Sequence, residues 1–451
     1  MKRLPLSALS VRSGRILSVC RALCVTAALA ASLPAYANDG ITLKQYRRWL
    51  ETSSNVTLDS YFTYAQRAMK DRNYYEAEWA LRKLLSNSGG ELDRVKLDLS
   101  LALLAQGKFL DARDYLEEVL RKNPPPQVQQ NIRALLAQVG KQLSPHRITG
   151  NLTVGFNSDT NGNSAPGSGQ VSIIDTSVTL DPSAQETDDI NYFTALSVNH
   201  TYRHDTQNRT KTIRWKTDLV GYLSRQDKLD QLDVSLFSAR TGPEVTWLNT
   251  GVRAGLFASH SVVSLDGKGY LRNPKGEFVL DIPINTRLTA SSNTSLEYRE
   301  FLNSETVTIY EDRNGRAWQQ TFGLRYAFND KWAVDGNLFY RSEGARQNYY
   351  SNHQYGGGVG LTHLFTKSLM MNTRLGYRYF DYDAADFLIS NKVREDRESS
   401  FGVTLAKSFT IDGYETKPSA TLGYVYRDMQ SNIQNYDYDN HRVTTALNLP
   451  F

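Results

Sequence analysis

The strongest constraint on this chain is a sequence period of two that runs through its last three hundred or so residues. After Ser144 and Pro145, apolar or aromatic residues alternate with polar ones in one segment after another. Clear examples are the segments 152–157, 213–219, 322–328 and 371–379. Successive side chains of a strand point to opposite faces, so each segment predicts a β-strand with one apolar and one polar face.

The number of these segments and the composition of their polar faces indicate how the strands assemble. Counting between turn signals gives an even number near fourteen, which is in the range of outer-membrane barrels. A soluble sandwich of this size would need a second apolar face on its strands, but here that face carries Arg, Lys, Asp, Asn and Gly. We therefore expect an α + β membrane protein whose transmembrane antiparallel β-barrel has a polar lumen and a lipid-facing outer wall.

The connections between segments alternate in length. Short ones are expected at Thr241-Gly242-Pro243, Asn329-Asp330 and Thr366-Lys367-Ser368, and longer polar ones at residues 158–189 and 384–397. Outer-membrane barrels have short periplasmic turns and longer external loops. This alternation predicts that the short turns face the periplasm.

The chain ends in a segment that resembles the closing strand of an outer-membrane barrel. Between His441 and Phe451, one face carries Val443, Thr445, Leu447, Leu449 and Phe451, and the other is mostly polar. In that resemblance Phe451, with Leu449 and Leu447, is the signal read by the barrel-assembly machinery. The alternative is an ordinary amphipathic strand at the end of a soluble β domain.

The first 37 residues predict a secretory signal peptide. Five basic residues precede or begin an apolar run at 22–33, and Ala35-Tyr36-Ala37 supplies small residues for cleavage after Ala37. Cys20 and Cys24 both lie inside this segment, so the mature chain has no cysteine.

The expected mature chain carries no formal net charge. Subtracting the five basic residues of the signal from 52 Lys plus Arg leaves 47, equal to the 47 Asp plus Glu. A formally neutral mature chain argues against a nucleic-acid partner.

Residues 38–145 have a helical period and a repeat of 35 residues. Gly107, Phe109 and Ala112 occupy the turn and second-helix positions of a tetratricopeptide-like helix pair, and Tyr74 and Ala77 occupy the matching positions one repeat earlier. We predict a periplasmic tetratricopeptide-like domain at 38–145, followed by the barrel at 146–451. It is either a plain helical scaffold or a peptide-binding surface.

The sequence offers no catalytic, cofactor or metal site. His200 and His204 lie four apart on one strand face but lack a third ligand at a recognisable spacing. No nucleophile is paired with a base in a recognisable pattern, so we expect no enzyme activity. The candidate contacts for a substrate are charged residues predicted to face the lumen, namely Arg214, Lys216, Asp218, Arg253, Asp335, Arg374 and Arg378.

The domain order resembles that of the surface lipoprotein assembly modulator family, the Slam proteins. The first strand and its loop, residues 150–166 (GNLTVGFNSDTNGNSAP), are similar to that family's strand that enters an Asp- and Asn-rich loop ending in Ala-Pro. The resemblance covers residues 60–451, although the helical domain is shorter than in the larger members.

This resemblance implies a translocon in the bacterial outer membrane that works without a cofactor. Its client would be a cognate protein from the periplasm, either a surface lipoprotein or a soluble haem- or iron-scavenging protein. The other partners expected are outer-membrane lipids and the barrel-assembly machinery. Two rivals are a polysaccharide-export porin with a tetratricopeptide scaffold and a passive porin or adhesin barrel, which would not need the helical domain.

Overall fold

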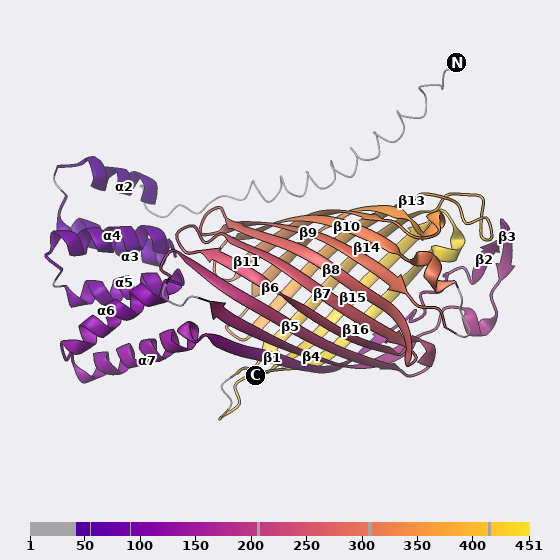
Figure 1. Cartoon of the computed structure of the whole chain (residues 1–451), viewed down its shortest axis with the longest axis horizontal. Helices are drawn as coiled ribbons and strands as arrows, with labels where there is room; N and C mark the ends of the chain where they lie inside the picture. The colour runs from indigo at the N-terminus through magenta and orange to yellow at the C-terminus, as the bar shows by residue number, and fades with distance from the viewer. Residues whose placement is uncertain (1–41, 55, 91, 205–207, 305–308, 414–415) are drawn as a thin grey trace, which may run out of the picture.

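A computed structural model describes residues 42–451 apart from 55, 91, 205–207, 305–308 and 414–415. The expected signal peptide, 1–37, lies outside the described residues. The described part contains a helical unit followed by a closed barrel (Figure 1). None of its helices is both long and apolar enough to span a membrane.

The helical unit consists of antiparallel helices joined by short turns. The described helices are α2 (Leu43–Thr52), α3 (Leu58–Lys70), α4 (Tyr74–Asn87), α5 (Asp93–Ala105), α6 (Phe109–Arg121) and α7 (Pro126–Leu143). Thr42 caps α2 in a capping box with Gln45, and Pro126 stands at the start of α7, where a missing N–H costs nothing. The turn positions one repeat apart, Arg72 and Gly107, both have a positive φ, 58° and 75°.

Small residues bring the paired helices together. Ala77 of α4 and Ala112 of α6 are fully buried, and Leu81, Leu99 and Leu103 fill the space around them. A second cluster, with Leu116, Val119 and Ile132, fastens α7 to the stack. This is the packing expected for the repeat-packing residues, because Ala lets helix axes approach closely.

The barrel is a closed ring of fourteen antiparallel strands. They are β1 (His146–Asp159), β4 (Asp189–His204), β5 (Lys211–Gln226), β6 (Val234–Trp247), β7 (Arg253–Leu265), β8 (Lys268–Pro283), β9 (Leu288–Phe301), β10 (Gly315–Ala327), β11 (Trp332–Glu343), β12 (Asn352–Leu364), β13 (Leu369–Tyr382), β14 (Glu395–Ser408), β15 (Ser419–Ser431) and β16 (Tyr438–Pro450). Each strand pairs with its neighbour in chain order, and β16 closes the ring against β1. The barrel predicted from the period of two is confirmed.

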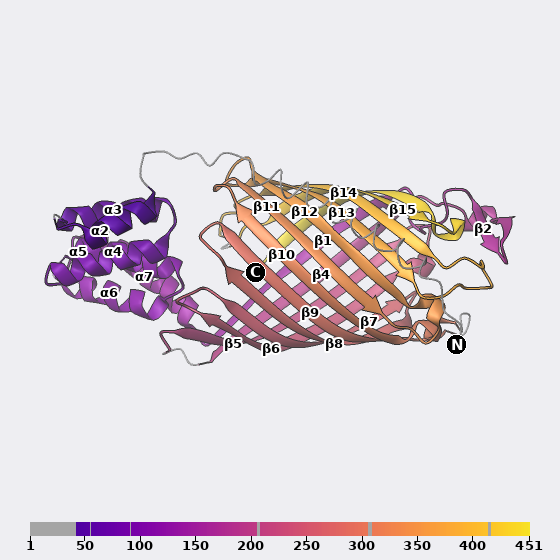
Figure 2. The same cartoon turned by 90° about the horizontal axis from the view of Figure 1, so that it is seen from above.

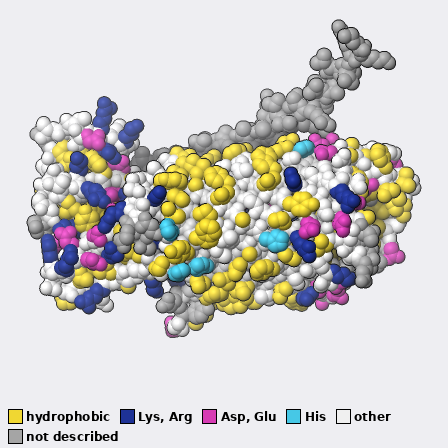
Figure 3. Space-filling model, viewed as in Figure 1, with side chains coloured by type: hydrophobic (Ala, Val, Ile, Leu, Met, Phe, Trp, Pro, Cys, Tyr) yellow, Lys and Arg dark blue, Asp and Glu magenta, His cyan; other side chains and the backbone are white. Residues whose placement is uncertain are grey.

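The two faces of the strands divide as their composition predicts. The outer wall carries large apolar side chains, such as Leu256 and Phe322, which are 61% and 60% exposed in the absence of lipid. Yellow apolar side chains cover much of the wall in Figure 3, whereas charged ones gather on the helical unit and toward the other end of the barrel. A wall of this kind suits a hydrocarbon environment.

The two ends of the barrel differ. The chain enters β1 from α7 at one end, and β16 finishes at the same end, where the helical unit lies (Figures 1 and 2). At the opposite end the loop after β1 forms a hairpin of β2 (Gln170–Ile173) and β3 (Thr176–Thr179). This hairpin binds other loops, for example through Ser172 N–H to Asn435 Oδ1 at 2.6 Å and Asp175 N–H to the Ile389 carbonyl at 3.1 Å.

One predicted turn is wrong. Thr241-Gly242-Pro243 lies inside β6, and the chain reverses instead at residues 248–252. Gly and Pro are turn signals, but here Pro243 only interrupts the ladder to β7, whose pairing resumes in the same register at Glu244. Gly242 is needed for close approach, since a Cβ there would lie 2.1 Å from the Leu256 carbonyl oxygen. The turns at Asn329-Asp330 and Thr366-Lys367-Ser368 stand where the sequence predicts them.

Candidate functional site

The inner face of the barrel is a polar wall, and the strand registers place all seven predicted lumen residues on it. Arg214, Lys216 and Asp218 lie on β5, Arg253 on β7, Asp335 on β11, and Arg374 and Arg378 on β13. Their side chains reach partners on adjacent strands and even across an intervening strand. The wall is a band of ion pairs and not a single pocket.

Glu244 of β6 is the centre of the first ion-pair network. Its side chain is buried, Lys216 Nζ donates to it at 2.8 Å, and the Arg214 and Arg253 guanidinium groups lie at 3.7 and 3.8 Å. Arg253 also pairs with Asp281 of β8. Glu244 is not among the lumen residues predicted from the sequence, because the residues before it were expected to form a turn. If the alternation of β6 is continued through Pro243, Glu244 falls on the inner face of the barrel.

Arg240 of β6 organises a second network. It donates to Asp218 at 3.1 Å and to Glu277 of β8 at 2.8 Å, and its guanidinium lies 3.5 Å from the centre of the Phe257 ring. The side-chain amide of Asn293 also donates a hydrogen bond to the Glu277 carboxylate, at 2.7 Å. Sequence reasoning missed Arg240 and Glu277, although both lie on the polar face of alternating segments.

Glycines of β12 allow a third network to form between β11 and β13. Arg374 donates to Asp335 at 3.1 Å and to Asn337 at 2.7 Å, across the intervening strand. A Cβ at Gly360 would lie 2.8 Å from Asp335 Oδ1, so only a glycine leaves room for this carboxylate. Arg378 contacts aromatic rings instead, because its guanidinium lies 5.3 Å from the centre of the Phe339 ring and 5.6 Å from that of Phe380.

The lumen therefore pairs charges of both signs along its wall. At these positions the wall presents no strong uncompensated charge, because each of the cations named above has a neighbouring anion or ring. Within the described residues no three His, Cys, Asp or Glu side chains are grouped to hold a metal.

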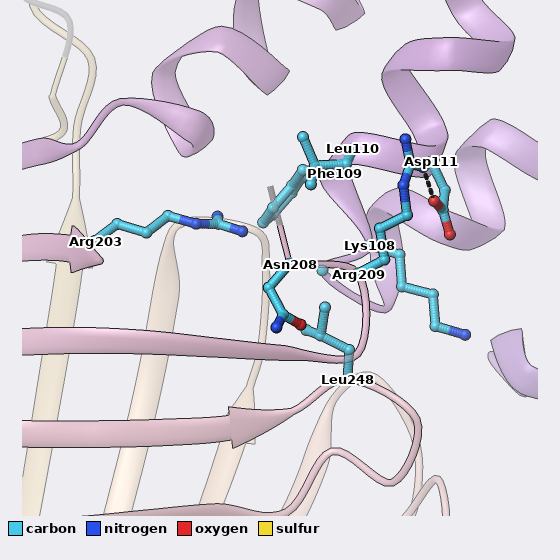
Figure 4. A pocket seen from close by; sticks show the side chains of 9 residues that line it. Lys108, Phe109, Leu110, Asp111, Arg203, Asn208, Arg209 and Leu248 are labelled. Atoms are coloured by element: carbon cyan, nitrogen blue, oxygen red, sulfur yellow. Dashed lines mark hydrogen bonds and ion pairs between the residues drawn. The ribbon is translucent and has the colours of Figure 1, made fainter. Parts of the chain in front are cut away.

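The helical unit meets the barrel at the mouth formed by the short turns. Arg209, in the turn between β4 and β5, pairs with Asp111 and, at 2.7 Å, with Asp114 of α6. These hydrogen bonds raise the pKa of Arg209 above its ordinary value. The side chain of Tyr75 donates to the Leu248 carbonyl at 3.3 Å in the next turn. Figure 4 shows Phe109 and Leu110 facing Asn208 and Leu248 across a small pocket at this junction.

A buried carboxylate ties the two helix pairs together beside this junction. Glu78 of α4 accepts from Lys108 at 2.6 Å, at the α5–α6 turn, and from Arg82 at 2.9 Å. Burial alone would raise the pKa of the Glu78 carboxyl, but these two hydrogen bonds lower it below its ordinary value. The repeat-packing residues Gly107 and Phe109 flank Lys108, so the helix tip at the barrel mouth is held rigidly.

The last residue closes the ring. Phe451 N–H donates to the Gly150 carbonyl at 2.9 Å, and Gly150 N–H donates to the Phe451 carbonyl at 2.8 Å. Leu447 and Leu449 pair with Val154 and Leu152 on the outer face. These three residues of the predicted assembly signal therefore lie at the seam between the first and last strands.

Residues 272–451 match the surface lipoprotein assembly modifier family, SlipAM. The match runs from within β8 through the whole of β9 to β16, and it confirms over this region the family resemblance drawn from the sequence. The SlipAM match begins after the β1 segment 150–166, so the similarity of that segment stays a prediction. The family name describes assembly of lipoproteins at a surface and no chemical reaction.

No curated protein matches the chain. Solved structures similar in fold include the outer membrane channel DcaP of Acinetobacter baumannii, 11% identical with a TM-score of 0.39, where the match covers 68% of this chain and 97% of that one. A loop-deletion mutant of OmpT of Vibrio cholerae is 7% identical with a TM-score of 0.39, covering 68% and 100%. A bacterial polysaccharide outer membrane secretin is 9% identical with a TM-score of 0.35, covering 67% and 98%.

Proposed function

We propose that this protein is an outer-membrane translocon that exports or surface-displays a specific cognate protein. The observation that carries the proposal is the SlipAM match over residues 272–451, which covers most of β8 and the eight strands that follow it. The client is a surface lipoprotein or a soluble haem- or iron-scavenging protein delivered from the periplasm.

The two ends of the barrel support a proposed orientation in the membrane. The helical unit, both chain ends of the barrel and most of the short turns lie at one mouth, and the longest loops lie at the other. Short turns are typical of the periplasmic side. These features support our proposal that the helical unit at 38–145 lies in the periplasm, where it is the first part of the protein that a client meets.

The lumen supports passage of a polypeptide better than selection of a charged polymer. Arg214, Lys216, Arg240 and Arg374 are each paired with a carboxylate on a neighbouring or next strand. A polysaccharide porin that selects a charged chain needs a stripe of one sign, and the mixed pairs do not provide one. The energy for export comes from folding or binding of the client outside, because the outer membrane supplies no ATP.

The lumen residues Arg214, Lys216, Asp218, Arg253, Asp335, Arg374 and Arg378 are proposed as the wall that an unfolded client touches. The seam residues Leu447, Leu449 and Phe451 are proposed as the contact with the barrel-assembly machinery. Lipids of the outer membrane cover the apolar outer wall.

Co-expression tests the function directly. The protein is expressed with the secreted or lipidated proteins encoded beside it, and each candidate is measured at the cell surface by antibody labelling and protease accessibility. One candidate should reach the surface only when the translocon is present. A chain lacking residues 39–142 should still insert as a barrel but lose export of that client. Export at the wild-type level by the truncated chain would show that the helical unit is not the receiving site.

A further inference from the structure

The contacts between the helical unit and the barrel are distributed unevenly around the mouth. On one side lie the covalent link from α7 into β1, the pairs of Arg209 with Asp111 and Asp114, and the Tyr75 contact to the β6–β7 turn. These attachments involve neighbouring strands, β1 and β4 to β7. They form a continuous attachment along one arc of the rim.

An ion pair joins the helical unit to the other side. Arg72, at the α3–α4 turn, pairs with Asp330 of the β10–β11 turn at 2.7 Å. Six strands, β5 to β10, separate this turn from the β4–β5 turn in one direction around the ring of fourteen. The two contact points are therefore almost opposite, and the helical unit lies across the mouth between them. Figures 1 and 2, seen at right angles, both show it lying beyond this end of the barrel.

The two sides differ in strength. The Arg72 and Asp330 side chains are 60% and 67% exposed, and an exposed ion pair contributes little. The opposite side combines the covalent link from α7 into β1 with the ion pair of Arg209 to two carboxylates. If the unit separates from the rim, it separates at Asp330 first.

Arg72 itself occupies an unfavourable backbone position. Its φ of 58° is the left-handed conformation that Gly107 adopts one repeat later, and a side chain there costs free energy. The turn that presents Asp330 is ordered, because Asn329 Oδ1 accepts from the N–H groups of Lys331 and Trp332. An arginine in a left-handed conformation thus contacts an aspartate that is presented by an ordered turn.

We propose that the helical unit is a hinged lid over the lumen, attached on the β1 to β5 side by the α7–β1 link and Arg209, and latched by Arg72 and Asp330. The Tyr75 contact lies three residues from Arg72 at the same helix tip and opens together with the latch. The closed lid prevents solutes from leaking through an idle barrel. Release of the latch lets the unit swing away on its hinge and opens the polar lumen to the periplasm. The proposal concerns access to the lumen and holds whether or not the proposed client export is correct.

Ion conductance of the full mature chain in planar lipid bilayers tests the lid. The Arg72→Cys/Asp330→Cys variant is linked with a short bis-maleimide that a reductant cleaves; the expected mature chain has no other cysteine to react. Linkage should hold the current at the closed level, and reduction should restore it. The matched control is Asp114→Cys/Arg209→Cys, linked at the hinge, whose current should not depend on linkage.

Charge reversal gives a second measurement that needs no linker. Arg72→Glu and Asp330→Arg should each raise the mean conductance by up to about fivefold. This is the change in the ratio of open to closed lids expected when an exposed ion pair of the strongest kind is lost. The double variant should return to the wild-type conductance. Helical circular dichroism checks that each variant is folded. Equal currents in the linked and cleaved Arg72→Cys/Asp330→Cys protein, or equal conductance in all the charge variants, would show that the helical unit does not gate the lumen.

Discussion

The backbone N–H groups of Phe451 and Gly150 each donate to the carbonyl of the other residue, and the Phe451 ring covers the α-carbon of Gly150. A Cβ at Gly150 would lie 2.2 Å from Cζ of that ring. At this end of the β1–β16 seam, an aromatic ring from the end of one strand packs where the other strand carries no side chain. Because these residues close the ring, a change at either is a change in barrel closure.

Gly150→Val should weaken closure of the barrel. The valine side chain would displace the Phe451 ring, and overpacking of this kind costs about 1–3 kcal/mol. The measurement is the urea concentration at which the folded, heat-modifiable band is lost on gel electrophoresis. Gly221→Val is the matched control, because Gly221 on β5 has open space where its Cβ would stand. Equal midpoints for the two variants would contradict a special role for the seam.

Glu244→Gln should destabilise the barrel, since Lys216, Arg214 and Arg253 would lose their shared carboxylate. Hydrogen bonds to charged groups contribute about 1.5–3 kcal/mol, and we expect a loss in this range. Unfolding of the detergent-solubilised protein in guanidinium, followed by tryptophan fluorescence, measures it. Glu300→Gln serves as the control, because Glu300 is exposed and lies 3.8 Å from Arg272. The idea of a central carboxylate fails if the two variants lose the same stability.

Acid should loosen the helical unit through Glu78. The pKa of its carboxyl is lower in the folded protein than its ordinary value of 4.5, so the unfolded chain binds the proton more readily. The stability that Glu78 contributes is present above pH 4.5 and is lost as the pH falls through the folded pKa. Helical circular dichroism during acid titration should show this loss in the wild type and a flatter curve in Glu78→Gln. Superimposable curves would exclude Glu78 as the source.

The two tips of the helix pairs should respond oppositely to substitution. Gly107→Ala places a Cβ at a φ of 75° and should cost about 1 kcal/mol. Arg72→Gly relieves the same conformation one repeat earlier and should leave the helical unit at least as stable as the wild type. Urea unfolding followed by helical circular dichroism compares them. A loss of stability in Arg72→Gly as large as that in Gly107→Ala would mean that the Arg72 side chain stabilises the helical unit itself.

Local patterns determined the architecture. The period of two predicted the strands and their two faces, because each side chain's direction depends only on its position in its own strand. The repeat at Tyr74, Ala77, Gly107, Phe109 and Ala112 predicted the helix pairs for a similar reason, since helix contacts recur at short, regular spacing. The count of about fourteen strands needed no knowledge of how any two strands meet.

Only the tertiary structure decided which groups meet. The turn expected at Thr241-Gly242-Pro243 became part of β6 because pairing with β5, which is continuous through residues 241–244, outweighs the local turn preference of Gly and Pro, and this brought Glu244 to Lys216. Arg374 reaches Asp335 across a strand because the wall curves and Gly360 leaves room. Arg72 faces Asp330, 258 positions later in the chain, because the ring closes and brings that turn round to the mouth. Such contacts depend on register and closure of the whole barrel, which no short stretch of sequence contains.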